Sequence, residues 1–291
     1  MPKKKRKRQG PTPPRKPRAA PRPPSKGDYV PGSVVISYLH PGTVESAFHE
    51  SVINSFTFDA LEGCNHLWNG GGKISISSGA NITRGRNAAV RRFLDETNAE
   101  WLWIVDSDMV WKPDALEQLV HNADKDERPF IGGLCFGQKA PMEDPSLGMA
   151  PFPTLFFMGE NGKTFMSWEY PEDTLYEVDA TGAAFLLVHR TLLQKMRDKY
   201  EEARAPFTWF AEEVVAGKHF SEDIVFCLRA KTCGAPVLVH TGVKVGHVKP
   251  RILEEREYLE WWAKAKPKLE EGQDATPQEW WASFNKAEEE V

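Results

Sequence analysis

Short apolar segments alternate with amphipathic segments over the first hundred folded residues, and this alternation limits the fold more than any other feature of the chain. Runs of β-branched and apolar residues predict strands at 34–39, 73–77, 101–105 and 129–135. Helical patterns between and after them predict helices at 44–56, 83–98 and 113–121. The alternation predicts an α/β fold with a mixed, mainly parallel sheet flanked by helices. Ligands of such sheets bind beyond the carboxyl ends of the strands, so functional residues are expected there.

The rest of the chain predicts a less regular arrangement. Residues 138–175 are rich in Pro, Gly, Met and aromatic residues, which favours an antiparallel meander with extended pieces at 154–158 and 163–168. Further elements are predicted as a strand within 178–188, as strands at 236–240 and 243–248 and as helices at 190–203 and 221–233. We therefore expect a disordered tail over residues 1–29, one α/β domain over 30–250 and a helical extension over 251–291.

Composition excludes several classes of protein. A hydrophobic fraction of 41% is enough for a sizeable core, so the chain as a whole is not disordered. The four cysteines form no CxxC pair, which argues against a zinc ribbon and against a disulfide-rich secreted scaffold. No apolar run reaches the roughly 18–20 residues that cross a bilayer, and no apolar segment follows the basic N-terminus. We expect a cytoplasmic protein that does not insert into membranes.

Charge is strongly segregated along the chain. Residues 1–27 hold 11 Lys and Arg and 8 of the 22 prolines, without any Asp or Glu. The remaining residues hold 26 of the 37 basic residues and all 41 acidic ones, a formal charge of −15. Such a tail suits nucleic acid or another polyanion as a partner. The alternatives are a solubilising tail, a tail that folds onto its own acidic domain, or a nuclear-localisation signal.

Two aspartates follow the third predicted strand directly. Asp106 and Asp108 flank Ser107, and alternate residues of an extended chain point to the same side. Two carboxylates held together favour a cation between them, and Mg²⁺ and Mn²⁺ prefer oxygen ligands. The alternative is a solvated turn in which one aspartate caps the next helix. The position at the end of a buried strand favours a metal site.

At this point the sequence resembles the family 2 glycosyltransferases of the GT-A (Rossmann-like) fold. The segment Trp103 to Asp108 resembles their DxD element, and Thr83 to Ala89 resembles the basic helix start before it. Asp179 to Arg190 resembles the acceptor-side glycine strand, and Ser221 to Ala230 resembles the acidic ED helix. Gly246-His247 resembles the late metal-binding histidine. The resemblance covers about residues 33–250 in a consistent order and implies that residues 30–250 form a GT-A catalytic domain.

The resemblance implies sugar transfer from a nucleoside-diphosphate sugar, with a UDP-sugar favoured, to an acceptor hydroxyl. Mn²⁺ or Mg²⁺ would be held by Asp106, Asp108 and His247 and would neutralise the leaving diphosphate. Asp223 would be the general base of an inverting reaction, with Glu222 as the second choice. For Glu222 and Asp223 the alternative role is to stabilise the first turn of a helix by their charge.

The implied binding residues fall into two groups. Donor-binding residues lie after the first strand, at the start of the second helix and in the DxD element: Pro41, Gly42, Thr43, Arg84, Arg86, Asn87, Asp106, Ser107 and Asp108. Acceptor-binding residues are Gly182, which would allow close approach of the backbone, and Trp209, which would stack on an acceptor ring. The alternatives are a plain turn at 41–43, an exposed basic helix face at 84–87 and a core position for Trp209.

Some features depart from the family pattern and leave other functions open. No QxxRW element follows the ED helix, which argues against a processive polysaccharide synthase, and residues 181–184 are more aliphatic than in some relatives. Small glycosyltransferases encoded by bacteriophages have a similar general make-up, so a modified DNA base or a virion protein is an expected acceptor, with activity in the host cytoplasm. The alternatives are a nucleotidyltransferase with the same metal site and a non-catalytic nucleic-acid-binding protein.

Overall fold

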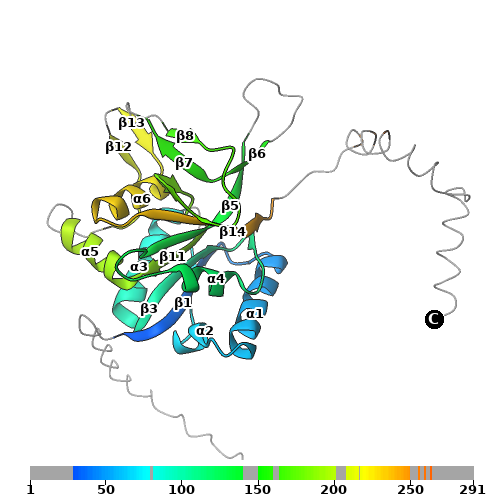
Figure 1. The fold of residues 1–291 in the computed structure, drawn as a ribbon, viewed down its shortest axis with the longest axis vertical. Helices are drawn as coiled ribbons and strands as arrows, with labels where there is room; N and C mark the ends of the chain where they lie inside the picture. The colour runs from blue at the N-terminus through cyan, green and yellow to red at the C-terminus, as the bar shows by residue number, and fades with distance from the viewer. Residues whose placement is uncertain are drawn as a thin grey trace, which may run out of the picture. The chain divides into compact units, whose positions relative to one another are not determined.

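A computed structural model describes residues 29–78, 81–139, 150–159, 164–200, 208–215 and 217–249, together with residues 255, 259 and 263 (Figure 1). The strands are β1 (Val30–His40), β2 (Lys73–Ser77), β3 (Ala99–Asp106), β4 (Met109–Val110), β5 (Phe130–Lys139), β6 (Ala150–Pro153), β7 (Leu155–Met158), β8 (Thr164–Met166), β9 (Leu175–Val178), β10 (Ala180–Thr181), β11 (Phe185–His189), β12 (Glu213–Val215), β13 (Lys218–Phe220) and β14 (Val237–His247). The helices are α1 (Ser46–Leu61), α2 (His66–Asn69), α3 (Ile82–Glu96), α4 (Ala115–Asn122), α5 (Arg190–Tyr200) and α6 (Glu222–Thr232).

The central sheet has the strand order β2-β1-β3-β11-β5-β14-β4, with β6 paired to β5 and β9 paired to β14. The strands β2, β1, β3, β5 and β14 run in one direction, while β11 runs against both of its neighbours. The predicted α/β class with a mixed, mainly parallel sheet is therefore confirmed. The strands β10, β7 and β8 form a small second sheet, and β12 pairs with β13.

Each face of the sheet packs against its own set of helices, as Figure 1 shows. Leu102 and Ile104 of β3 belong to a core with α3, α5 and α6, whereas Trp101, Trp103 and Val105 belong to a core with α1, α2 and α4. Successive side chains of a strand point to opposite faces, which explains why this continuous apolar run enters both cores. A strand buried on both faces is held firmly, so the residues at its carboxyl end have fixed positions.

Several predicted elements differ from the structure. The range 178–188 holds two strands and not one, because β10 pairs in the small sheet before β11 begins at Phe185 in the central sheet. The strands expected at 236–240 and 243–248 form one strand, β14, with a shift in register between His240 and Lys244. The short elements α2 and β4 were not predicted, since two or four residues carry no periodic signal. Helix α1 begins at Ser46, two residues after the predicted start.

The predicted terminal segments lie mostly outside the described residues. This holds for the tail at 1–29, of which only Tyr29 is described, and for the extension at 251–291, of which Glu255, Leu259 and Ala263 are described as helical. Among the described residues, no helix combines the length and the apolar character that crossing a bilayer requires.

Candidate active site

The DxD element lies at the carboxyl end of β3, beside the end of β1. Asp106 is opposite Leu39 in the parallel pairing of β3 with β1, and its backbone N–H donates to the carbonyl of Ala184 (2.9 Å). After Ser107, the chain turns into the two-residue strand β4. The two aspartates are thus placed by a buried strand on one side and by a sheet pairing on the other.

The pairing of β4 with β14 brings His247 to Asp108. His247 is opposite Met109 in this pairing, and Val248 N–H donates to the Asp108 carbonyl (2.8 Å). The Nδ1 of His247 lies 2.9 Å from the carbonyl oxygen of Phe136, and its Nε2 lies 2.9 Å from Oδ2 of Asp108. A carbonyl oxygen only accepts, so Nδ1 carries the proton and donates. A neutral ring then directs the Nε2 lone pair at a carboxylate oxygen, an arrangement that a cation between the two atoms stabilises.

Arg86 of α3 joins the DxD element to the acidic start of α6. Its Nη2 lies 3.1 and 3.0 Å from the two carboxylate oxygens of Asp106. Its Nη1 lies 3.1 Å from Oε1 of Glu222 and 2.5 Å from Oδ1 of Asp223. The guanidinium is buried, with 4% of the side chain exposed, and the Phe210 ring lies 5.6 Å from its Cζ. Residues more than 100 positions apart are therefore held around one buried cation.

The electrostatics of this cluster favour a further cation. Burial alone would lower the pKa of Arg86, but the charges of Asp106, Asp223 and Glu222 raise it above its ordinary value, so Arg86 stays protonated. Desolvation raises the pKa of Asp106 against the opposing effect of Arg86. Desolvation and the neighbouring Asp223 also raise the pKa of Glu222. Three carboxylates around one guanidinium leave a formal charge of −2 beside Asp108.

A cavity of about 390 Å³ opens next to the DxD element. It lies beyond the carboxyl ends of β1 and β3, and its lining comprises Leu39, His40, Pro41, Thr43, Val44, Glu45, Ser78, Ile82, Asp106, Ser107 and Asp108. This volume falls within the range of about 300–1,000 Å³ that is usual for small-molecule sites. Five of the predicted donor-binding residues line it, together with His40, Glu45, Ser78 and Ile82, to which no sequence pattern had pointed.

The remaining predicted donor-binding and acceptor-binding glycines and arginines take different positions. Gly42 has a φ of 133°, in the region that favours glycine, and its N–H donates to Nδ1 of His40 (3.2 Å). Arg84 is exposed, and its backbone N–H is capped by the Asn81 side chain (2.8 Å). A Cβ added at Gly182 would lie 3.7 Å from Thr154, an ordinary contact, so the surrounding protein does not require glycine there.

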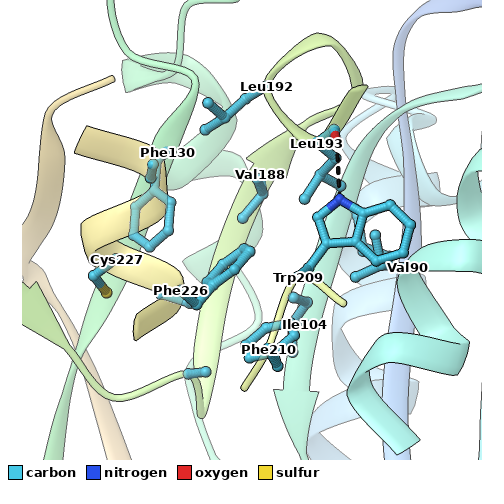
Figure 2. Packing of buried hydrophobic residues seen from close by; sticks show 14 of the residues in the cluster. Val90, Ile104, Phe130, Val188, Leu192, Leu193, Trp209, Phe210, Phe226 and Cys227 are labelled. Carbon is cyan, nitrogen blue, oxygen red and sulfur yellow. Dashed lines mark hydrogen bonds between the residues drawn. The ribbon is translucent and has the colours of Figure 1, made fainter. Parts of the chain in front are cut away.

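Asn87 and Trp209 lie in the interior rather than at a ligand surface. Asn87 Nδ2 donates to the Phe210 carbonyl (2.7 Å), and Phe210 N–H donates to Asn87 Oδ1 (3.0 Å). Trp209 is 2% exposed, and its indole N–H donates to the Leu193 carbonyl (2.8 Å), as Figure 2 shows. The predicted stacking of Trp209 on an acceptor ring does not fit this burial, and the core alternative is correct. The predicted contact of Asn87 with the donor does not fit either, because both polar atoms of its amide bind backbone of the interior.

Sequence reasoning also missed how Arg86 is used. It is predicted to bind the donor, whereas the structure directs both terminal nitrogens at carboxylates of the protein. The Phe210 ring, which lies 5.6 Å from the Arg86 Cζ, stacks on Phe226 at 4.1 Å between centroids (Figure 2). Arg86 lies three and four residues before the apolar Ala89 and Val90, a spacing that places this arginine on the buried side of the helix.

Two solved structures are similar to this chain over three quarters of its length. The A197 protein from STIV is 16% identical, with a TM-score of 0.43, over 75% of this chain and 86% of that protein. The structure of GalNAc-T7 with UDP, GalNAc and Mn²⁺ is 12% identical, with a TM-score of 0.48, over 75% of this chain. This chain spans 44% of the length of GalNAc-T7. No curated protein matches the chain.

A sequence profile of a known family covers most of the domain described above. The profile is that of the glycosyltransferase-like family 2, and it matches residues 75–261. The matched segment begins in β2 and includes α3, the DxD element, the start of α6 and His247. It therefore covers every residue of the cluster around Arg86, together with the Asp108–His247 pair. The chain belongs to the glycosyltransferase-like family 2.

Proposed function

We propose that this protein is a divalent-metal-dependent glycosyltransferase that moves a sugar from a nucleoside-diphosphate sugar to an acceptor hydroxyl with inversion. The observation that carries the proposal is the meeting of Asp106, Asp108 and His247 with Glu222 and Asp223 at one edge of the sheet, beside the 390 Å³ cavity. Membership of the family supports the same reaction class.

The residues present fit a hard or borderline divalent ion. Asp108 and His247 offer a carboxylate oxygen and an imidazole nitrogen 2.9 Å apart, and Asp106 follows on the same strand end. Oxygen ligands suit Mg²⁺ and Mn²⁺, and an imidazole favours Mn²⁺. When bound, the ion would neutralise the charge that grows on the leaving diphosphate. The Nδ1–H bond of His247 to Phe136 fixes the ring in the orientation that such ligation needs.

The cavity suits the nucleoside part of the donor, since Pro41 and Thr43 line it beside Asp106 and Asp108. The acceptor would approach from the side of Gly182 and the first turn of α6. The acceptor oxygen forms a bond to the anomeric carbon, the bond from that carbon to the diphosphate oxygen breaks, and its electron pair leaves with the diphosphate. The proton of the acceptor hydroxyl goes to the carboxylate of Asp223. Arg86 orients this carboxylate, because its Nη1 donates to Oδ1 of Asp223.

Donor binding followed by product analysis tests the proposal. Calorimetry with UDP-, GDP- and dTDP-sugars, in Mn²⁺ and in chelator, should find one donor whose binding needs the metal. Asp108→Asn keeps the side-chain shape and should abolish this binding, whereas Asp126→Asn, an exposed residue of the α4–β5 loop, should leave it unchanged. Release of free nucleoside diphosphate identifies glycosyl transfer, whereas release of pyrophosphate would identify a nucleotidyltransferase. Failure of every donor to bind would contradict the proposal.

We further infer a nucleic-acid acceptor or scaffold from the charge of residues 1–27 alone. Counterion release makes such binding fall steeply with salt. The full chain should therefore bind DNA with a strong salt dependence that is lost when residues 1–27 are deleted. DNA binding that is unaffected by the deletion would contradict this inference, and donor binding is expected to be the same in both proteins.

A further inference from the structure

A second group of ligand-type side chains lies between α1, α2 and α4, and nothing in the proposed reaction uses it. Cys64 and His66 come from the turn that leads into α2, and Glu117 comes from the first turn of α4. A thiol sulfur, an imidazole nitrogen and a carboxylate oxygen of these residues all lie within 4.8 Å of one another. Among the described residues, no other group of three or more Cys, His, Asp or Glu side chains has its ligand atoms this close together.

The orientation of the His66 ring determines which of its nitrogens donates and which accepts. Nδ1 lies 2.6 Å from the carbonyl oxygen of Gly32, so this nitrogen donates and carries the proton. Nε2 lies 3.0 Å from Oε2 of Glu117. In the neutral ring, an acceptor nitrogen thus faces an acceptor oxygen. A histidine whose second nitrogen is bound to a backbone carbonyl is the usual arrangement of a metal-bound imidazole.

The backbone that carries these ligands is held in place. Both carboxylate oxygens of the buried Asp59 accept from the start of α2, from His66 N–H at 2.8 Å and from Leu67 N–H at 3.2 Å. Between the two ligands, Asn65 has a φ of 58°, a left-handed conformation that Asn tolerates better than most residues. This turn directs Cys64 and His66 toward the same point, where Glu117 arrives from α4.

A small cavity adjoins the three side chains. It has a volume of about 10 Å³, and Ser55, Asp59 and neighbouring apolar residues also line it. Ligands at about 2.0–2.3 Å from a tetrahedral ion lie roughly 3.3–3.8 Å apart, so atoms that already lie within 4.8 Å of one another would have to approach by no more than about 1.5 Å. Side-chain rotation of a partly exposed glutamate can provide that movement.

A proton is the competing occupant of the gap between Nε2 and Oε2, and it would give an ordinary imidazolium–carboxylate pair. In such a pair the thiol would only donate to the Glu117 carboxylate, whereas a metal would bind the sulfur itself, so the state of the sulfur distinguishes the two cases. Desolvation and the Glu117 carboxylate, to which the thiol is hydrogen-bonded, raise the pKa of Cys64 to about 11. A cysteine that binds a metal does so as a thiolate, so uptake of a metal here should release protons.

We propose that Cys64, His66 and Glu117 bind one borderline divalent metal ion of the zinc class, separate from the ion of the catalytic site. Sulfur, nitrogen and oxygen together suit Zn²⁺ rather than Mg²⁺ or Ca²⁺. The His66 ring rests on Gly32 near the start of β1, whereas the donor cavity is lined by Leu39 and His40 at its end. Gly32 and Leu39 are seven residues apart on β1, which corresponds to roughly 23 Å, so the two sites are separate. The ion would fasten the α1–α2 turn to α4 and so hold the face of the sheet behind the donor cavity.

The experiment uses the full chain, stripped of metal with a chelator and then titrated with Co²⁺ and Zn²⁺. A cysteine-bound Co²⁺ gives an intense thiolate-to-metal absorption band in the near ultraviolet. We expect this band at one equivalent, its loss on addition of Zn²⁺, and proton release on binding. The band should persist in Asp108→Asn, which alters the catalytic site, and in Cys233→Ser, a matched thiol variant beyond the end of α6.

Variants of the ligands decide between the metal and the proton. Cys64→Ser should abolish the band, and His66→Gln should weaken Zn²⁺ binding at least tenfold. Zn²⁺ should raise the melting temperature of the wild-type chain and not that of Cys64→Ser. If Cys64→Ser does not fold, the same Zn²⁺ tests are made with Glu117→Gln, because Glu117 is partly exposed and its substitution disturbs the fold less. Absence of the band in the wild-type chain, or an unchanged band in folded Cys64→Ser, would overturn the proposal.

Discussion

Nε2 of His247 lies 2.9 Å from Oδ2 of Asp108, although 139 residues separate them in the chain. The contact depends on the antiparallel pairing of β4 with the end of β14, which sets His247 opposite Met109. The other ring nitrogen is fixed by the Phe136 carbonyl at 2.9 Å. We propose that this pair supplies two ligands of one ion.

Replacing His247 should therefore weaken metal-dependent donor binding more than it weakens the fold. In His247→Gln the side chain keeps a polar end but loses the imidazole nitrogen, and we expect the Mn²⁺ concentration for half-maximal donor binding to rise about 10–100-fold. Calorimetry at increasing Mn²⁺ measures this shift. His121→Gln, at an exposed position in the last turn of α4, is the control. An unchanged Mn²⁺ dependence in His247→Gln would remove this residue from the metal site.

Arg86 should be the most sensitive single position of the site for stability. Arg86→Met leaves three partly buried carboxylates without their shared cation, and we expect a loss of about 2–4 kcal/mol, because such carboxylates still reach some solvent. Arg86→Lys keeps the charge but cannot contact both sides at once and should lose less. Urea unfolding measures both. The exposed Arg84→Met on the same helix should change stability by less than about 0.5 kcal/mol, and an equal loss there would contradict the role assigned to Arg86.

Substitutions of Asp223 and of Glu222 should lower kcat by different amounts. If Asp223 takes the acceptor proton, Asp223→Asn should lower kcat by about 10²–10⁴-fold while donor binding persists. Glu222→Gln should have a smaller effect, because Glu222 is not the proposed base and the amide oxygen of Gln can still accept from Arg86. Steady-state rates with the identified donor, together with calorimetric donor affinity, test this order. A larger loss in Glu222→Gln would transfer the role of base to Glu222.

Trp209 should matter for stability and not for the acceptor. Trp209→Phe removes the indole N–H that binds the Leu193 carbonyl and leaves that buried oxygen without this donor, at a cost of about 1–3 kcal/mol. The acceptor KM of the folded variant should equal that of the wild type. Trp168→Phe serves as the control, because this tryptophan is 57% exposed. A raised acceptor KM with unchanged stability would restore the stacking role.

Acid should destabilise the protein in part through Glu100. Burial alone would raise the pKa of Glu100, but hydrogen bonds from His189 and from Gly32 N–H lower it below its ordinary 4.5 in the folded state. A lowered folded pKa means that this contribution is complete above pH 4.5 and is lost as the pH falls through the folded value. Glu100→Gln should therefore show a shallower loss of unfolding free energy below pH 4.5 than the wild type. Parallel curves for the two proteins would show that Glu100 does not contribute.

Local pattern was sufficient for the elements that carry the site. The strand 73–77 and the start of α6 at Glu222 follow from apolar runs and from an acidic first turn. The aspartates were located because a strand buried on both faces reads as a continuous apolar run that ends abruptly in charge. The break between β10 and β11 was not predicted, because a small residue such as Gly182 fits a strand and a turn equally well.

The sequence by itself determined the α/β class, the family, the segregation of a basic tail from an acidic domain, and the positions of the acidic pairs at element ends. These features depend on neighbours within a few residues, where periodicity and capping act. Only the tertiary structure decided that Arg86 faces three carboxylates, that Asn87 and Trp209 are buried, and that Cys64 and His66 meet Glu117. Strand order and helix packing create these contacts between distant segments, and a side chain on a helix has no local signal for the partner that the opposite element will bring.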